Sequence, residues 1–182
     1  FFCFVLMMFC AGAGEMTMSQ WSSAFAESAL GVSKTIGDLA GPCTFAILMG
    51  TSRAIYGKYS SLLPLKKMMV GSGMLCVVSY LLTVFAPHPI FSLVGCGLCG
   101  FSVGIFWPGT FSMAAISLPG AGTAMYALMA LAGDVGCSQG PTVVGLVADA
   151  MNGDLKKGIL VAILFPVVIT MGLFLLRTPK RK

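Results

Sequence analysis

Two carboxylates lie well inside otherwise apolar segments of this chain, at Glu15 and Asp134. Placing a charge at the centre of a bilayer costs about 2.5–3.5 kcal/mol on insertion scales. Such a group must face a water-filled cavity, pair with a cation or hold a proton. Each of the two acids is therefore a candidate site for binding protons or a polar substrate. The other four acids lie at or near the ends of the apolar segments, where water is within reach.

No lysine or arginine lies as deep within any apolar segment as these two acids do. The nearest candidate, Arg53, lies near the end of its segment. We therefore expect Glu15 to be an unpaired carboxyl that can load and release a proton near neutral pH. Without a cation in the apolar segments, organic anions are disfavoured as ligands relative to small uncharged polar solutes.

Helical spacing places further polar residues on the same arc as Glu15. At 100° per residue this arc spans roughly 160°. Its members are Ser19, Gln20, Ser22 and Ser23. Asp134 lies on a narrower stripe of polar and small residues, namely Thr123, Ala127, Ser138, Pro141 and Gly145. The spacing predicts that both faces line a pathway, and a structural hydrogen bond between helices is the alternative for each acid.

The composition requires a membrane setting for these acids. The chain is 57% hydrophobic and only 9% charged, with a mean hydropathy of +0.94. A soluble domain has roughly 25% charged residues, so this chain has too little charge to cover a water-facing surface. The segments are too long for the strands of a closed barrel and do not alternate. The sequence therefore predicts an all-α protein with several membrane-spanning helices.

Six segments have the roughly 20 mostly apolar residues that a membrane helix needs. The predicted six-helix bundle covers residues 1–176, with spans at 1–26, 36–58, 65–86, 90–116, 121–148 and 157–176, followed by a basic cytoplasmic tail at 177–182. Eight of the eleven basic residues lie in the tail or around the junction of the second and third spans. Cytoplasmic loops are rich in Lys and Arg, so we expect both chain ends in the cytoplasm. The net charge of +5 is then a topology signal rather than a nucleic-acid-binding patch.

Proline occurs inside three of the predicted spans. The fourth span contains Trp107 and Pro108, the fifth contains Pro141 and the sixth contains Pro166. Proline removes a backbone hydrogen bond, and in lipid the freed carbonyl must find another partner. We expect breaks at these positions that point to a transport pathway, although proline and glycine are common in membrane helices in general. Trp107, beside such a break, could stack on a substrate or pack against lipid.

Glycines four residues apart form three pairs, which are Gly37 with Gly41, Gly100 with Gly104, and Gly136 with Gly140. This spacing lets helix backbones approach closely. We interpret the pairs as packing contacts.

Three stretches together resemble the C-terminal six-helix half of a major facilitator superfamily (MFS) transporter. The junction "MGTSRAIYGKYSSLLPLKK" resembles the glycine–acid–arginine–glycine–basic loop signature of that family, with Gly50, Arg53, Gly57 and Lys58 in similar roles. The acid of the signature is absent here, which puts its charge pairing in gating in doubt. The other two stretches are "GCGLCGFSVGIFWPGTFSMAA", similar to the kinked tenth helix, and "GTAMYALMALAGDVGCSQGPTVVGLVAD", similar to the eleventh.

The resemblance implies a twelve-helix fold of two six-helix halves around a central cavity, with the N-terminal half missing from this chain. On that alignment Glu15, Ser19, Gln20 and Trp107 face the substrate, and Asp134 lies on a flanking helix. The implied function is secondary transport of a small polar solute by alternating access, coupled to protons. The pattern is most similar to sugar–proton symporters of the fucose-permease type. The implied location is a bacterial inner (plasma) membrane. We expect a protein without enzyme activity, cofactor, metal or nucleic-acid partner.

Two other function classes are open on the residues alone. "GCGLCG" places Cys96 and Cys99 at the spacing of a redox pair, as in a membrane thiol oxidoreductase, but without basic neighbours. An intramembrane protease would need a histidine at membrane depth or two facing acids. The single histidine, His88, lies in a loop, so only Glu15 and Asp134 could fill that role.

Overall fold

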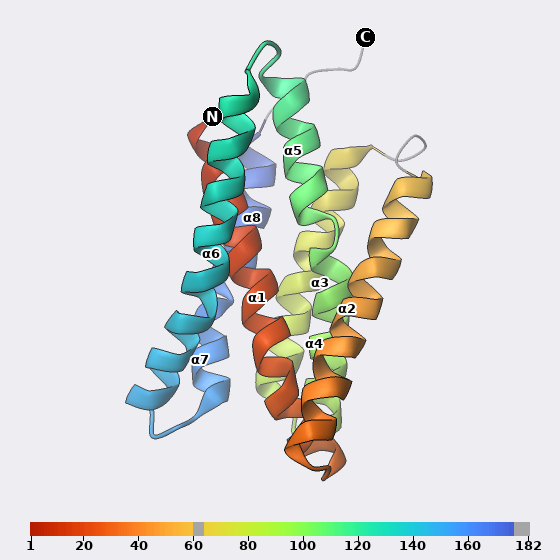
Figure 1. Ribbon diagram of the computed structural model, residues 1–182, viewed down its shortest axis with the longest axis vertical. Coiled ribbons are helices and arrows are strands. Elements are labelled where there is room, and N and C mark those ends of the chain that lie inside the picture. The colour runs from red at the N-terminus through yellow and green to blue at the C-terminus, as the bar shows by residue number, and fades with distance from the viewer. Residues whose placement is uncertain (60–63, 177–182) are drawn as a thin grey trace.

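The computed structural model describes residues 1–59 and 64–176, apart from the side chains of residues 28–30. The described chain is all-helical and contains no strand, which confirms the predicted class. The helices are α1 (Phe2–Leu30), α2 (Lys34–Tyr59), α3 (Leu65–Phe85), α4 (Pro89–Val103), α5 (Phe106–Ser117), α6 (Thr123–Ala150), α7 (Leu155–Ala162) and α8 (Leu164–Leu175). The pairs α4–α5 and α7–α8 each form one column, so six columns cover nearly the same residues as the six predicted segments (Figure 1). The predicted tail at 177–182 lies outside the described residues.

Four columns in the described chain are long and apolar enough to cross a membrane. They span Phe2–Glu27, Leu65–Phe85, Pro89–Ser117 and Leu155–Leu175. The remaining two, α2 and α6, have 26 and 28 residues. At 1.5 Å per residue these two helices are about 40 Å long, so length does not distinguish them from the other four. They are more polar, because they carry residues such as Arg53, Asp134 and Gln139.

α1 lies at the centre of the bundle, where it contacts α2, α4, α6 and α8. Glycine lets its two polar neighbours approach closely. A Cβ atom on Gly136 would collide with the backbone of Phe9, and one on Gly41 would lie 2.5 Å from the carbonyl oxygen of Ser22. One turn further along α2, a Cβ on Gly100 of α4 would lie 2.5 Å from the carbonyl oxygen of Phe45. The three predicted glycine pairs therefore mark the α1–α6, α1–α2 and α2–α4 contacts.

Two columns are broken shortly before a proline. The α4–α5 column is interrupted at Gly104 and Ile105, four and three residues before Pro108. The α7–α8 column is interrupted at Ile163, three residues before Pro166. Because proline has no N–H and its ring clashes with the carbonyl four residues earlier, each helix opens at that point.

The predicted break at Gly140 and Pro141 is wrong, because α6 runs through it without interruption. α2 likewise continues through Pro42, a proline that the sequence analysis did not single out. A glycine precedes each of these two prolines, whereas Trp107 and Phe165 precede the prolines at the breaks. The proline ring clashes with the Cβ atom of the preceding residue in helical geometry, and glycine has no Cβ atom. This difference accounts for the two continuous helices.

Hydrogen bonds between distant segments fix which helix ends lie together. The side chain of Lys66, at the start of α3, donates to the carbonyl of Leu176, just beyond α8. At the opposite end, Lys156 Nζ donates to the carbonyl oxygen of Ala86 at 2.9 Å. The α2–α3 junction and the end of α8 therefore share one end of the bundle, as the predicted topology requires.

Candidate functional site

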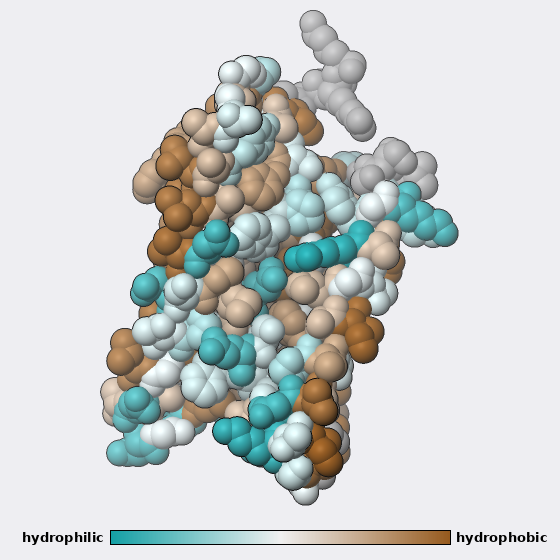
Figure 2. Space-filling view, viewed as in Figure 1, coloured by the Kyte–Doolittle hydropathy of each residue, from teal (hydrophilic) through white to brown (hydrophobic). Residues whose placement is uncertain are grey.

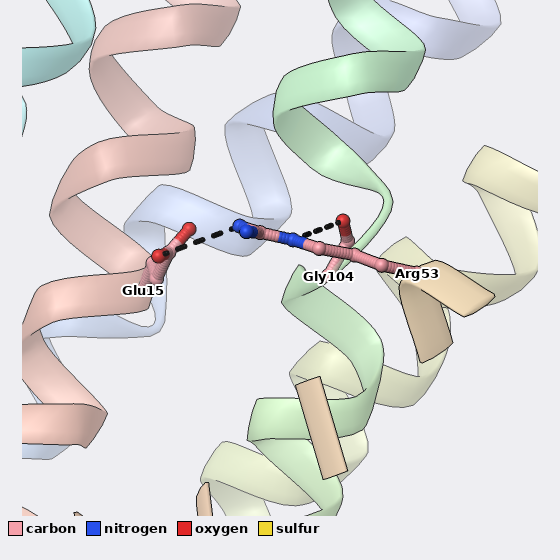
Figure 3. Close-up of polar contacts among 3 residues, drawn as sticks. All are labelled: Glu15, Arg53 and Gly104. Carbon is pink, nitrogen blue, oxygen red and sulfur yellow. Dashed lines mark hydrogen bonds and ion pairs between the residues drawn. The ribbon is translucent and has the colours of Figure 1, made fainter. Parts of the chain in front are cut away.

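The side chain of Arg53 connects three columns of the bundle (Figure 3). From α2 it extends toward α1, where its Nη2 atom lies 3.9 Å from Oε1 of Glu15. On the way, its Nε–H donates to the carbonyl oxygen of Gly104 at 3.3 Å, at the α4–α5 break. The Glu15 side chain is 15% exposed and that of Arg53 is 46% exposed. The pair therefore lies on an open face of the bundle, and Glu15 is near the middle of α1.

Pro108 explains why the Gly104 carbonyl is available to Arg53. In an unbroken helix, the N–H of residue 108 would bond to the carbonyl of residue 104, and proline cannot supply it. Gly104 also packs closely on α2, since a Cβ there would lie 2.8 Å from the Met49 carbonyl oxygen and 3.1 Å from Ser52 Cβ. This close contact holds the freed carbonyl within reach of Arg53.

The structure corrects two expectations about charge. Glu15 is not without a cation, because the long side chain of Arg53 reaches it from α2. The four residues assigned to a gating loop, Gly50, Arg53, Gly57 and Lys58, lie within the last turns of α2 rather than in a loop. The premise that disfavoured organic anions is therefore wrong.

Five polar side-chain atoms on α1 and α5 are buried without a hydrogen-bond partner in the described part of the chain. They are Glu15 Oε2, Thr17 Oγ1, Trp21 Nε1, Trp107 Nε1 and Thr110 Oγ1. Buried polar groups are usually satisfied in native proteins, so an orphaned group calls for a ligand, water or a changed conformation. Glu15 Oε2 is the one of these atoms that belongs to the ion pair itself.

Trp107 lies one helical turn beyond Gly104 and packs against α6. A Cβ atom on Gly133 would lie 2.6 Å from its indole ring. The ring is followed by Phe111, with centroids 6.4 Å apart, and then by Tyr126, 6.0 Å further on. Trp107 thus starts an aromatic row along the α5–α6 contact, half-buried and with its N–H unpartnered.

The other predicted site residues divide between the open face and the helix contacts. Ser19 is half-buried, and its carbonyl accepts a hydrogen bond from Ser22 at 2.6 Å. Gln20 is exposed, so it remains available to a ligand. Ser22 is fully buried in the α1–α2 contact, so its predicted place on a pathway is wrong. Figure 2 shows that the middle of the face is pale and teal, with brown mainly along its edges.

Asp134 is exposed on α6 and is not part of the ion pair. The thiol of Cys137, one turn along α6, lies within electrostatic range of both carboxylates. The predicted Asp134 stripe is exposed at Thr123, Ala127 and Ser138 but buried at Pro141. Within the described residues, Asp134 forms no ion pair.

The cysteine pair of the alternative hypothesis lies away from this face. Cys96 and Cys99 are 1% and 0% exposed, and Cys99 Sγ lies 3.8 Å from Cys76 Sγ of α3. All seven cysteines are free. No group of three or more His, Cys, Asp or Glu residues within the described chain could hold a metal ion.

An apolar groove near the N-terminus differs in character from the Glu15 region. It is a groove of about 460 Å³ between the first turns of α1 and the N-terminal half of α6, lined by apolar side chains including Phe2, Phe9, Leu131 and Val135. It has no side chain that could orient a polar solute.

A scan of known protein families and searches of curated proteins and of solved structures find no match to this chain.

Proposed function

We propose that the chain is one six-helix half of a secondary transporter of the MFS type. It moves a small polar solute across a plasma membrane, in a bacterium the inner membrane, by alternating access coupled to protons. Glu15 is the proton site, and Ser19, Gln20 and Trp107 contact the solute. The N-terminal six-helix half completes the pathway, and the C-terminus is cytoplasmic. A sugar is the solute class that the MFS resemblance implies.

The observation that carries this proposal is the Glu15–Arg53 pair beside a proline-induced helix break. A carboxylate within an apolar bundle is costly and marks a functional site by default. Broken helices at membrane depth are tolerated where they face protein or line a cavity. Here the acid, its cation and the freed carbonyl of Gly104 lie within one set of contacts.

The Arg53 linkage gives proton binding a way to move the helices of the bundle. Arg53 joins α1 to the α4–α5 break through Glu15 and Gly104. When Glu15 takes up a proton, the charge attraction between α1 and α2 is lost. The two states of Glu15 therefore favour different arrangements of these columns, as proton-coupled alternating access needs.

The polarity of α2 and α6 supports the same proposal. These two columns flank α1 and are as long as membrane spans, but are less apolar than the other four. A helix whose open face lines a water-filled pathway needs fewer apolar residues than one surrounded by lipid. We infer that α2 and α6 also cross the membrane and border the pathway.

The competing functions gain no supporting observation. The Cys96 and Cys99 thiols are buried away from solvent, which hinders exchange with any partner thiol. His88 lies at the start of α4, where its Nδ1 atom accepts a hydrogen bond from the Ile90 N–H at 3.3 Å. Glu15 faces Arg53 rather than a second acid.

The test is solute uptake by the full-length protein in vesicles with an imposed pH gradient. In a Glu15→Gln variant, we expect accumulation driven by the pH gradient to be lost while exchange of internal for external solute continues. Asp149→Asn is the matched control, because Asp149 is an exposed acid near the end of α6. Accumulation by Glu15→Gln equal to that of the wild type would contradict the proposed proton site.

A further inference from the structure

We propose that the transported solute carries a carboxylate, and that Arg53 binds this carboxylate while Glu15 holds the proton. The inference rests on the proposed transport function and replaces an uncharged sugar with a small organic acid as the substrate class. The juxtaposition behind it is a guanidinium, open to the polar face of the bundle, opposite a carboxylate that it approaches without a direct hydrogen bond.

Arg53 has unused binding capacity. Its Nε–H is engaged by the Gly104 carbonyl, but Nη2 lies 3.9 Å from Glu15 Oε1, beyond hydrogen-bond distance. Within the described residues, neither Nη group makes a hydrogen bond, and 46% of the side chain is exposed. A guanidinium binds a carboxylate through two parallel N–H···O bonds. The two Nη groups therefore present a vacant fork for one carboxylate.

When Glu15 takes up one proton, it no longer attracts Arg53, and the guanidinium is available to such a ligand. The step forms one O–H bond on the carboxylate and removes its negative charge, without any covalent or redox change. Its Oε2 atom is buried without a partner, so the protonated group also has an O–H that a bound solute could accept. Proton uptake and anion binding are thereby coupled, because both compete for the same Glu15–Arg53 attraction.

Arg53 is the single cation among the groups that face Glu15 from the described elements packed against α1. α2 contributes Arg53 and α6 contributes Cys137, whereas Asp134 of α6 is exposed. From α3, the Tyr80 hydroxyl donates to the Gly14 carbonyl at 2.8 Å. α5 and α8 carry no titratable side chain, and the cysteines of α4 are buried toward α3. The two lysines of α7 are engaged at the end of the bundle, where Lys156 donates to the Ala86 carbonyl and Lys157 pairs with Asp154. Among these described elements, no second cation competes with Arg53 for the anion.

The remaining polar atoms fit the hydroxylated part of a sugar acid. Trp107 Nε1 is buried without a partner, and its indole lies one turn beyond the Gly104 carbonyl that holds Arg53. An indole N–H can donate to a solute hydroxyl, and its ring can cover an apolar face of the solute. The substrate class is therefore a small hydroxylated monocarboxylic acid.

This mechanism fixes the electrical character of transport. One proton and one carboxylate enter together, so their charges cancel and uptake is electroneutral. A pH gradient alone should then drive accumulation, and a membrane potential alone should not. Symport of an uncharged sugar with a proton would move one positive charge and respond to both.

The experiment uses the full-length protein in vesicles, with labelled gluconate, glucuronate and galacturonate and the parent sugars glucose and galactose as probes. Uptake is measured with a pH gradient at zero potential, clamped by valinomycin with equal potassium, and then with a potassium diffusion potential at equal pH. We expect at least one acid to accumulate with the pH gradient and to show no response to the potential.

Two variants assign the anion to Arg53. Arg53→Gln removes the charge, and Arg53→Lys keeps the charge but removes the fork. We expect both to lower acid uptake, by about tenfold or more for loss of a bidentate pair. Lys67→Gln, which removes an exposed cation from the start of α3, should keep wild-type uptake. Thermal unfolding of each purified variant shows whether it is folded.

The outcomes separate the inference from the transport proposal. Potential-driven accumulation of a parent sugar, with none of the acids taken up, would overturn the carboxylate inference and leave the transporter intact. Acid uptake that is unchanged in both folded Arg53 variants would also overturn the inference. Uptake of none of the five probes above protein-free vesicles would count against the transport proposal itself.

Discussion

Glu15 and Asp134 are both carboxylates in the middle of long helices of the same bundle, and Cys137 lies within electrostatic range of both. Glu15 lies on the central helix, is 15% exposed and faces Arg53. Asp134 lies on a flanking helix and is exposed, without an ion pair in the described chain. The two acids therefore have different surroundings, although both lie near the middle of a long helix.

The difference comes from what the neighbouring columns offer. Glu15 lies opposite a break that leaves the Gly104 carbonyl without its helical partner, and this carbonyl positions the guanidinium. Asp134 belongs to a continuous helix that uses its glycines against α1 and turns the acid outward. An intramembrane acid becomes a candidate proton switch when a neighbouring helix also supplies a positioned cation.

Removal of the cation should have the largest effect on this contrast. In Arg53→Gln, Glu15 is left as a largely buried charge without a partner, which costs roughly 2–5 kcal/mol for such pairs. We expect transport to fall by about 100-fold, equal to about 2.7 kcal/mol. The second change in Arg53→Gln/Glu15→Gln should recover part of the lost thermal stability but not the transport. A double variant no more stable than Arg53→Gln would show that the two side chains are not coupled.

Restoring the helical hydrogen bond to the Gly104 carbonyl should weaken the contact of that carbonyl with Arg53. Pro108→Ala supplies an N–H to the Gly104 carbonyl, which then competes with Arg53 Nε. We expect a straighter column and transport lowered by about tenfold, the equivalent of one charge-assisted hydrogen bond of about 1.5 kcal/mol. Pro42→Ala, in a helix that is already continuous, is the control. Equal losses in the two variants would separate Pro108 from the Arg53 contact.

A methyl group at the break tests how closely α2 must approach. Gly104→Ala places a Cβ 2.8 Å from the Met49 carbonyl oxygen, so the backbones must separate. We expect a loss of about 1–3 kcal/mol in unfolding free energy, typical of overpacking. Gly50→Ala, where a Cβ meets open space, should instead gain up to about 1 kcal/mol. Thermal unfolding of the two variants side by side measures the difference, and a reversed order would contradict the packing.

The smallest effect belongs to the second acid. Asp134→Asn removes a charge that is exposed and forms no ion pair in the described residues. We expect uptake to change by less than about twofold, equal to about 0.4 kcal/mol and within the ±0.5 kcal/mol range of surface substitutions. Initial uptake rates across pH provide the measurement. A loss as large as that of Glu15→Gln would make the two acids equivalent and remove the distinction drawn between them.

More of the fold than of the candidate site can be predicted from the sequence. Apolar length predicts the helical columns, and glycine spacing predicts three of their contacts, because both depend on local patterns. The breaks depend on the residue before each proline, which explains why Pro141 was assigned a break that the structure does not contain. The sequence singles out Arg53 as the nearest cation but does not predict its contact with Glu15, because its long side chain reaches across from another helix. The orphaned carbonyl four residues before Pro108 was the signal that could have predicted where an arginine would bind.

The most direct test of the Glu15–Arg53 switch is an infrared difference spectrum of the full-length protein, recorded between neutral and acidic pH. The protonated carboxyl of Glu15 should give a C=O band that is absent from Glu15→Gln and retained in Asp134→Asn. This result would show that Glu15 takes up the proton while Asp134 does not. A band that persists in Glu15→Gln and disappears in Asp134→Asn would contradict the account and move the proton site to α6.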